Sequence, residues 1–154
     1  MLQFHVAISL VGILSGLVML YGLLIGRNFR TAIAVFFVTT IFTSLSGFPL
    51  PPFGFDPPRA VGVLSLILLV GGVAAYYGFR LAGPWRWIFV ACAVAALYFN
   101  VFVLVAQGFM KVPALHALAP TGSEPPFAIV QGIVLLIFIG LGIWAAVRFR
   151  PVRR

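Results

Sequence analysis

Long apolar stretches constrain this chain more than any other feature of its sequence. Five of them follow one another, separated by short polar or proline-containing segments, at residues 3–26, 31–48, 60–80, 86–109 and 127–148. A helix of about 20 mostly apolar residues crosses a hydrocarbon core about 30 Å thick. Because lipid offers backbone groups no partner, such a segment must be helical. The sequence therefore predicts an all-α, five-helix transmembrane bundle, with residues 1–154 forming a single domain.

The composition supports a membrane environment and argues against a nucleic-acid partner. Hydrophobic residues make up 63% of the chain and charged residues 8%, whereas soluble domains are about 45–50% apolar and about 25% charged. The net charge of +8 does not form one solvated basic face, because the arginines stand in small groups between apolar stretches. The lipid bilayer is therefore the expected partner.

The basic residues predict which way the bundle is threaded. With five spans, only Arg59 and Lys111 fall at one end of the bundle, and the other basic residues fall at the opposite end. Cytoplasmic loops of membrane proteins carry an excess of Lys and Arg. We therefore expect the N terminus to be outside and the C terminus to be cytoplasmic. The residues expected at the cytoplasmic end are Arg27, Arg30, Arg80, Arg86, Arg148, Arg150, Arg153 and Arg154.

Polar side chains within the apolar stretches gather in the half of the bundle expected to face outward. Such groups are costly in hydrocarbon unless they pair, pack inward or line a wet cavity. Two interpretations remain open: an outward-facing pocket that binds or passes a small molecule or lipid, or hydrogen bonds that only hold the helices together. The predicted pocket lining is His5, Ser9, Thr39, Thr43, Asn100, Gln107 and Gln131, and the predicted mouth is Asp56, Lys111, His116 and Glu124.

The direction of the side chains favours a shared site on the fourth span. At 100° per residue, Asn100 and Gln107 point within about 20° of each other. The chain has no Ser/His/Asp arrangement, no HExxH zinc motif and no glycine-rich phosphate loop. We therefore expect a non-enzymatic protein, and the sequence assigns it no catalytic residue, no metal and no cofactor.

Two histidines leave a redox role open as an alternative. His5 and His116 both fall at the outer end, where they could together hold haem or copper, or accept protons from a quinol. Two ligands without a cysteine or a further histidine nearby are a weak signal. The alternative is a membrane redox component or accessory subunit.

Glycine spacing in the first span predicts close helix packing. Gly12 with Gly16, and Gly22 with Gly26, repeat the GxxxG spacing that lets helix backbones approach one another in membranes. The close neighbour could be a helix of the same chain, a second copy of the chain or a subunit of a larger membrane complex.

The loop between the last two spans predicts a short surface helix and a helix start. Prolines bound residues 113–120, which could form a helix lying on the outer surface. Ser123 is a candidate cap for the fifth span, and the spacing of Thr121 and Glu124 fits a capping box. These roles are structural alternatives to a place for Glu124 at a pocket mouth.

The run LYFNVFVLVAQGFMKVPALHALAPTGSEPPFAIVQ, together with SGFPLP and GPWRW, carries a family resemblance. With these segments the chain resembles a group of small multi-pass proteins of the bacterial inner membrane. The resemblance covers most of the chain and implies that location. It implies no activity, cofactor or catalytic residue.

The threading can be tested by labelling cysteines introduced at Gly54 and Gly122. Both positions fall in outer loops of the predicted topology. A membrane-impermeant thiol reagent should therefore modify Gly54→Cys and Gly122→Cys in intact spheroplasts. Labelling of either site only after permeabilisation would show that the threading is reversed or that a span is missing.

Overall fold

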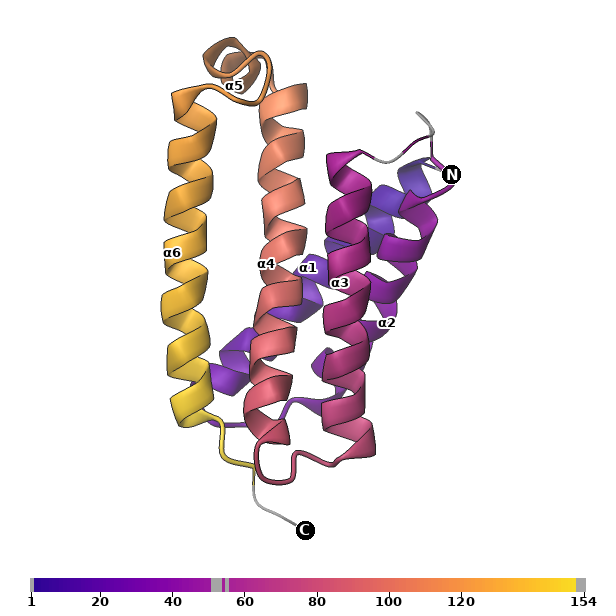
Figure 1. The fold of residues 1–154 in the computed structure, drawn as a ribbon, viewed down its shortest axis with the longest axis vertical. Coiled ribbons are helices and arrows are strands. Elements are labelled where there is room, and N and C mark those ends of the chain that lie inside the picture. Colours follow the sequence, from indigo (N-terminus) through magenta and orange to yellow (C-terminus); the bar gives the residue numbers. More distant parts are fainter. Residues whose placement is uncertain (1, 51–53, 55, 152–154) are drawn as a thin grey trace.

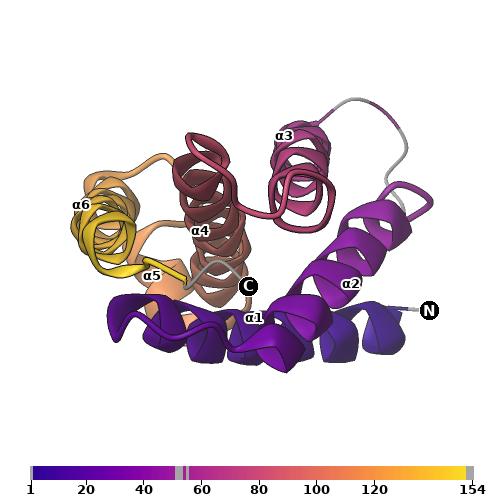
Figure 2. The same cartoon turned by 90° about the horizontal axis from the view of Figure 1, so that it is seen from below.

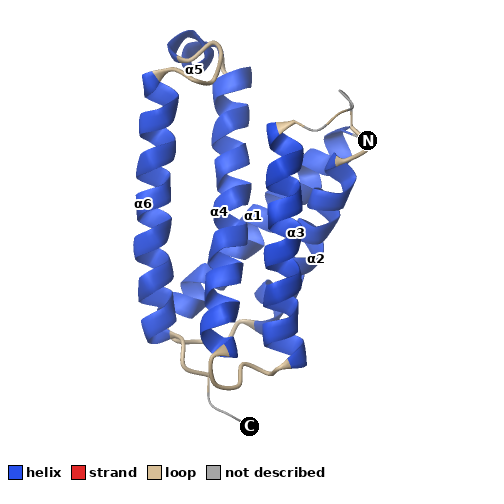
Figure 3. Cartoon of the chain, in the orientation of Figure 1, coloured by secondary structure: helices blue, strands red, loops and turns tan. Residues whose placement is uncertain are grey.

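The computed structural model describes residues 2–50, 54 and 56–151, and within them every regular element is a helix (Figure 1, Figure 3). Five of the helices are long and apolar enough to cross a membrane. The elements are α1 (Leu2–Leu24), α2 (Arg30–Gly47), α3 (Pro57–Val73), the π-helical segment η1 (Ala74–Gly78), α4 (Trp85–Lys111), α5 (Pro113–Leu118) and α6 (Pro125–Arg148).

The five predicted spans and the short surface helix are confirmed as helices. The fourth span, predicted over 86–109, is helical over Trp85–Lys111, and α5 occupies the proline-bounded segment. The third span continues beyond α3 through η1, so one apolar helical stretch covers Pro57–Gly78. Hydropathy and proline positions therefore located every long helix to within a few residues.

Local chemistry explains where two of these helices begin or end. After α1, Gly26 adopts φ 74°, and the N–H groups of Gly26 and Arg27 donate to the carbonyls of Leu23 and Gly22. This is the Schellman arrangement, which satisfies the last carbonyls of a helix and favours glycine. At the start of α3, the Asp56 carboxylate accepts the backbone N–H of Arg59 at 3.1 Å.

The helices form a row with one helix laid across it (Figure 1, Figure 2). The row contains α6, α4 and α3 side by side, and α2 lies next to α3. α1 runs obliquely behind the row and contacts α2, α4 and α6. Its oblique path brings the end of α1 against the lower end of α6, where Gly26 approaches the carbonyl of Arg148.

The hydrophobic core lies towards one end of the bundle, which we call the basic end. There α1 ends, α2 begins, α4 begins and α6 ends, so Arg27, Arg30, Arg86 and Arg148 share this end. The buried polar side chains Thr40, Ser65 and Gln131 lie nearer the opposite end. The largest fully buried apolar side chains are Met19, Leu23, Ile33, Phe36, Leu69, Phe89, Val90, Leu97 and Phe149.

The first GxxxG spacing packs within the chain. A Cβ atom on Gly16 would lie 2.5 Å from Leu97 Cδ1 and 2.8 Å from Phe36 Cδ2. Gly16 is therefore the point at which α1 approaches both α4 and α2. The second spacing extends past the helix, because Gly26 lies in the turn that follows α1.

Enlarging Gly16 should destabilise the bundle. In Gly16→Leu the new side chain must displace the buried Leu97 and Phe36, and overpacking of this kind costs about 1–3 kcal/mol. We expect a lower melting temperature in detergent. Gly140→Leu is the matched control, because a Cβ there meets no atom within 4 Å. Equal melting temperatures for the two variants would show that the α1 crossing does not depend on close approach.

Candidate functional site

Asn100 connects α4 to α2 where α1 crosses them. Its Nδ2 atom donates to Thr40 Oγ1 at 3.1 Å, and Thr40 is fully buried. A Cβ on Gly12 would lie 3.2 Å from Thr39 Oγ1, 3.3 Å from Thr40 Oγ1 and 3.8 Å from Asn100 Nδ2. The Thr39 hydroxyl also donates to the Val35 carbonyl at 2.7 Å. Asn100 and Thr39, which both belong to the predicted lining, therefore lie beside Gly12 of α1, although the hydrogen bond of Asn100 goes to Thr40.

His5 and Ser9 lie on α1 towards its N-terminal end. His5 Nδ1 and Ser46 Oγ are 2.8 Å apart, so this pair joins α1 to α2. The Ser9 hydroxyl donates to the Val6 carbonyl of its own helix at 2.7 Å. His116 lies on α5, which Figures 1 and 2 place on the far side of this end of the bundle from the start of α1. The described contacts do not bring the two histidines together.

Gln131 is buried between α6 and α4 and is incompletely bonded. Its Nε2 donates to the backbone carbonyl of Phe102 at 3.0 Å, and the residue is 7% exposed. Its Oε1 has no hydrogen-bond partner among the described residues, and neither does the buried Thr43 Oγ1 on α2. Most buried polar atoms are satisfied, so each exception calls for a physical explanation. Gln107 is half-buried and has no described hydrogen bond.

Asp56 and Glu124, two of the four predicted mouth residues, organise loops. Asp56 forms an ion pair with Arg59 at 2.9 Å, and Arg59 also donates to the Leu50 carbonyl at 2.6 Å. These contacts join the end of α2 to the start of α3. The two other mouth residues, Lys111 and His116, are exposed.

Glu124 occupies the N-cap position of α6, so the predicted Ser123 cap is wrong. The Glu124 carboxylate instead accepts hydrogen bonds from the Thr121 backbone N–H, the Thr121 hydroxyl and the Ser123 backbone N–H. The bond from the Thr121 hydroxyl lowers the pKa of Glu124. The predicted capping box is therefore also wrong, because Glu124 is the N-cap residue and Thr121 lies three residues before it, although the Thr121 N–H does bond to Glu124.

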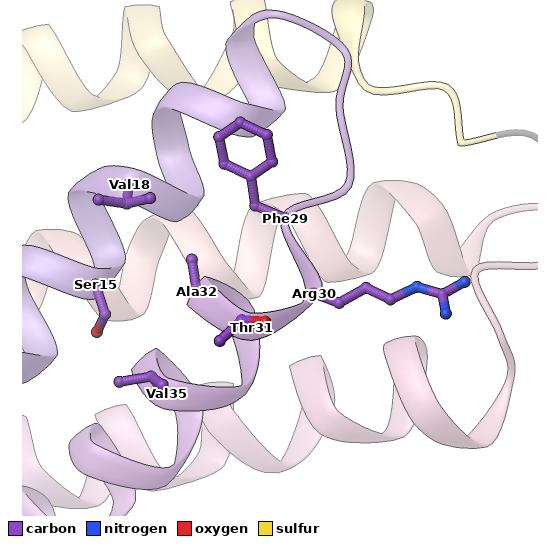
Figure 4. Close-up of a pocket in the computed structure, with 7 residues that line it drawn as sticks. All are labelled: Ser15, Val18, Phe29, Arg30, Thr31, Ala32 and Val35. Carbon is purple, nitrogen blue, oxygen red and sulfur yellow. The ribbon is translucent and has the colours of Figure 1, made fainter.

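Two shallow grooves lie near the basic end, away from the predicted polar pocket. One, of ≈ 480 Å³, lies between α1 and α2 (Figure 4). Val18 and Val35 line it, and the Arg30 guanidinium extends away from these side chains. The other, of ≈ 450 Å³, lies between α4 and α6 and is mainly apolar. None of the predicted pocket residues lines either groove.

Arg86 makes contacts that its position in the sequence does not predict. Its Nη1 donates to the carbonyls of Ala146 at 2.9 Å and Phe149 at 2.5 Å. Its guanidinium carbon lies 4.2 Å from the centre of the Trp87 ring. Arg86 therefore holds the end of α6 against the start of α4, and its charge complements the negative end of the helix dipole.

Comparisons with models of known protein families, with curated proteins and with solved structures find no match to this chain. Within the described residues, no group of three or more His, Cys, Asp or Glu side chains could hold a metal ion.

The bond between Asn100 and Thr40 should show measurable coupling in a double-mutant cycle. Hydrogen bonds between transmembrane helices average about 0.6 kcal/mol in such cycles and reach about 1.7 kcal/mol. The cycle uses Asn100→Leu, Thr40→Val and their combination, and it measures the free energy of unfolding in detergent. We expect a coupling within that range. A coupling indistinguishable from zero would mean that this contact does not hold the two helices together.

Proposed function

We propose that this protein is a non-enzymatic, multi-pass protein of the bacterial inner membrane that binds or passes a small molecule or lipid. The proposed orientation has the N terminus outside and the C terminus in the cytoplasm. Its binding site would lie in the outward half, near Gln131, Asn100 and Gln107. The supporting observation is the buried Gln131 Oε1 atom, which has no described partner.

An unsatisfied polar atom in this position costs free energy that a ligand would recover. Leaving a buried acceptor without a donor costs about 1–3 kcal/mol, and the cost is highest where water is excluded. A ligand with a hydroxyl, amine or amide could donate to Gln131 Oε1. The buried Thr43 Oγ1 on α2 is a second atom of the same kind in the same half of the bundle.

The distribution of packing supports a site in this half. The fully buried aromatic side chains Phe36, Phe89 and Phe149 all lie towards the basic end. Opening the outward half, opposite the basic end, to admit a ligand would therefore disturb less of the apolar core.

A second candidate function is that of a subunit in a homo-oligomer or larger membrane complex. One face of α6 is exposed, and Leu136 on this face is 69% exposed. A Cβ on Gly132 or Gly140 would meet no atom within 4 Å. Such a face could pack against a helix of another chain, because small residues let backbones approach. A redox role is the weaker proposal, because His5 is bonded to Ser46 and His116 lies on α5.

The proposed binding site can be tested by replacing Gln131 with leucine. Gln131→Leu removes the unsatisfied acceptor and should reduce the small molecules that co-purify in mild detergent, as measured by native mass spectrometry. Asn100→Leu with Gln107→Leu should have the same effect if these residues line the site. Gln3→Leu is the matched control, since Gln3 is exposed. If both altered proteins elute as folded species and retain the same bound molecule as the control, the proposal fails.

A further inference from the structure

Small side chains contribute to the lining of the groove between α4 and α6, beside the buried Val90, Val94 and Phe138. Ala91 and Ala95 contribute to it from α4, and Gly142 and Ala146 contribute from α6. Trp87 lines the groove at the basic end, and Tyr98 lines it furthest along α4. Small residues on both helices thus leave an apolar channel of ≈ 450 Å³ along their contact.

The open side of the groove, at Ala91 and Ala95, faces away from α1. Leu97 packs towards Gly16 of α1, and Ala95, two residues earlier, points about 200° away around the helix. Ala91 and Ile143 in the groove are exposed. In a membrane this side of the bundle must be covered by lipid or by another protein, because the side chains are apolar.

The length of the groove matches one leaflet. Trp87 and Tyr98 are separated by eleven positions on α4, which corresponds to a rise of about 16 Å. Half of a hydrocarbon core about 30 Å thick is about 15 Å. A partner helix would continue across both leaflets, whereas a lipid acyl chain ends near the middle of the bilayer. The dimensions therefore favour a lipid chain.

Arg86 does not line the groove, but it contacts two residues that line it near the basic end, Trp87 and Ala146. It lies over the ring of Trp87 and is bonded to the carbonyl of Ala146, another groove residue. A guanidinium has five N–H donors, and the described bonds of the Arg86 side chain use Nη1 alone. A guanidinium fork binds phosphate oxygens well. The bonds to α6 hold this one in place before any ligand arrives.

We propose that the groove binds an anionic phospholipid of the leaflet at the basic end. One acyl chain lies along Ala91 and Ala95, and the phosphate is bound by Arg86. Arg148 and Arg150, at the end of α6, are exposed and add positive charge at the same level. This site is separate from the polar site near Gln131, and neither proposal depends on the other.

Tryptophan quenching by brominated lipids can test this proposal. Trp85→Phe with Trp144→Phe leaves Trp87 as the reporter in the groove. Trp85→Phe with Trp87→Phe leaves Trp144, which is 53% exposed on α6 and does not line the groove. Each protein is placed in phosphatidylcholine vesicles that contain a series of mole fractions of dibrominated phosphatidylglycerol, or the same series of dibrominated phosphatidylcholine.

We expect half-maximal quenching of Trp87 fluorescence at a mole fraction of the anionic quencher that is roughly fivefold lower than that of the zwitterionic quencher. This is the preference expected from one arginine near an anionic surface. Trp144, which reports on the surrounding bulk lipid, should show a smaller preference. Equal preference at the two reporters would overturn the proposal. Protection of Trp87 from both quenchers would also overturn it, because protein would then cover the groove.

Two substitutions in the Trp87 reporter protein test the two parts of the site. Ala91→Leu fills the groove and should reduce the preference to that seen at Trp144, whereas Gly140→Leu places the same side chain where no atom lies within 4 Å and should leave it unchanged. Arg86→Gln should also reduce the preference, with Arg30→Gln as its control, since Arg30 is an exposed arginine of the same end of the bundle that lies on α2. Since Arg86→Gln removes two bonds to α6 as well, Ala91→Leu provides an independent test. Retained preference in Ala91→Leu would exclude the groove as the binding site.

Discussion

The close approach of α1 to α2 and α4 at Gly16 is the contact on which the arrangement of the other helices depends. Hydrophobicity does not draw helices together in lipid, so packing between small and large residues must do so. Because Gly16 has no side chain, Leu97 of α4 and Phe36 of α2 can pack directly against its backbone. One turn earlier, Gly12 leaves room for the bond between Asn100 and Thr40. α1 thus holds α2 and α4 together, and α3 and α6 pack on either side of α4.

The two halves of the bundle differ in how they are held together. Near the basic end, Phe37, Phe89 and Phe149 form a chain of ring contacts with centroid separations of 6.2 Å and 5.8 Å. Towards the opposite end, the described contacts between helices include polar bonds from His5 and Gln131. Polar bonds between membrane helices are individually weak. Ring contacts of Phe127 with Phe102 and Phe109 also join α4 to α6 there. The side chains Phe36, Phe89 and Phe149, which are fully buried, all lie towards the basic end, so the opposite half depends more on these polar bonds.

Hydropathy, proline and glycine were sufficient to predict the helices, but they could not predict the partners of the polar residues. The length of an apolar stretch shows that it can span a membrane and leaves its tilt and rotation open. Asn100 and Gln107 do lie on one face of α4, yet the partner of Asn100 is Thr40, which was not in the predicted lining. Gln131 donates to a backbone carbonyl, and no sequence pattern marks that acceptor. These contacts depend on the oblique path of α1 and on how α6 is rotated against α4.

Arg86 is one of the basic residues that predict the topology, and its side chain also forms specific contacts. The last carbonyls of α6 carry a partial negative charge, and without a cation nearby they would repel an anionic headgroup at the end of the α4–α6 groove. Arg86 neutralises the carbonyls of Ala146 and Phe149 through one of its nitrogens. Its remaining donors can then face the headgroup layer. Arg86 can thus bond to the last carbonyls of α6 and bind a phosphate at the same time, because a planar guanidinium presents its donors in more than one direction.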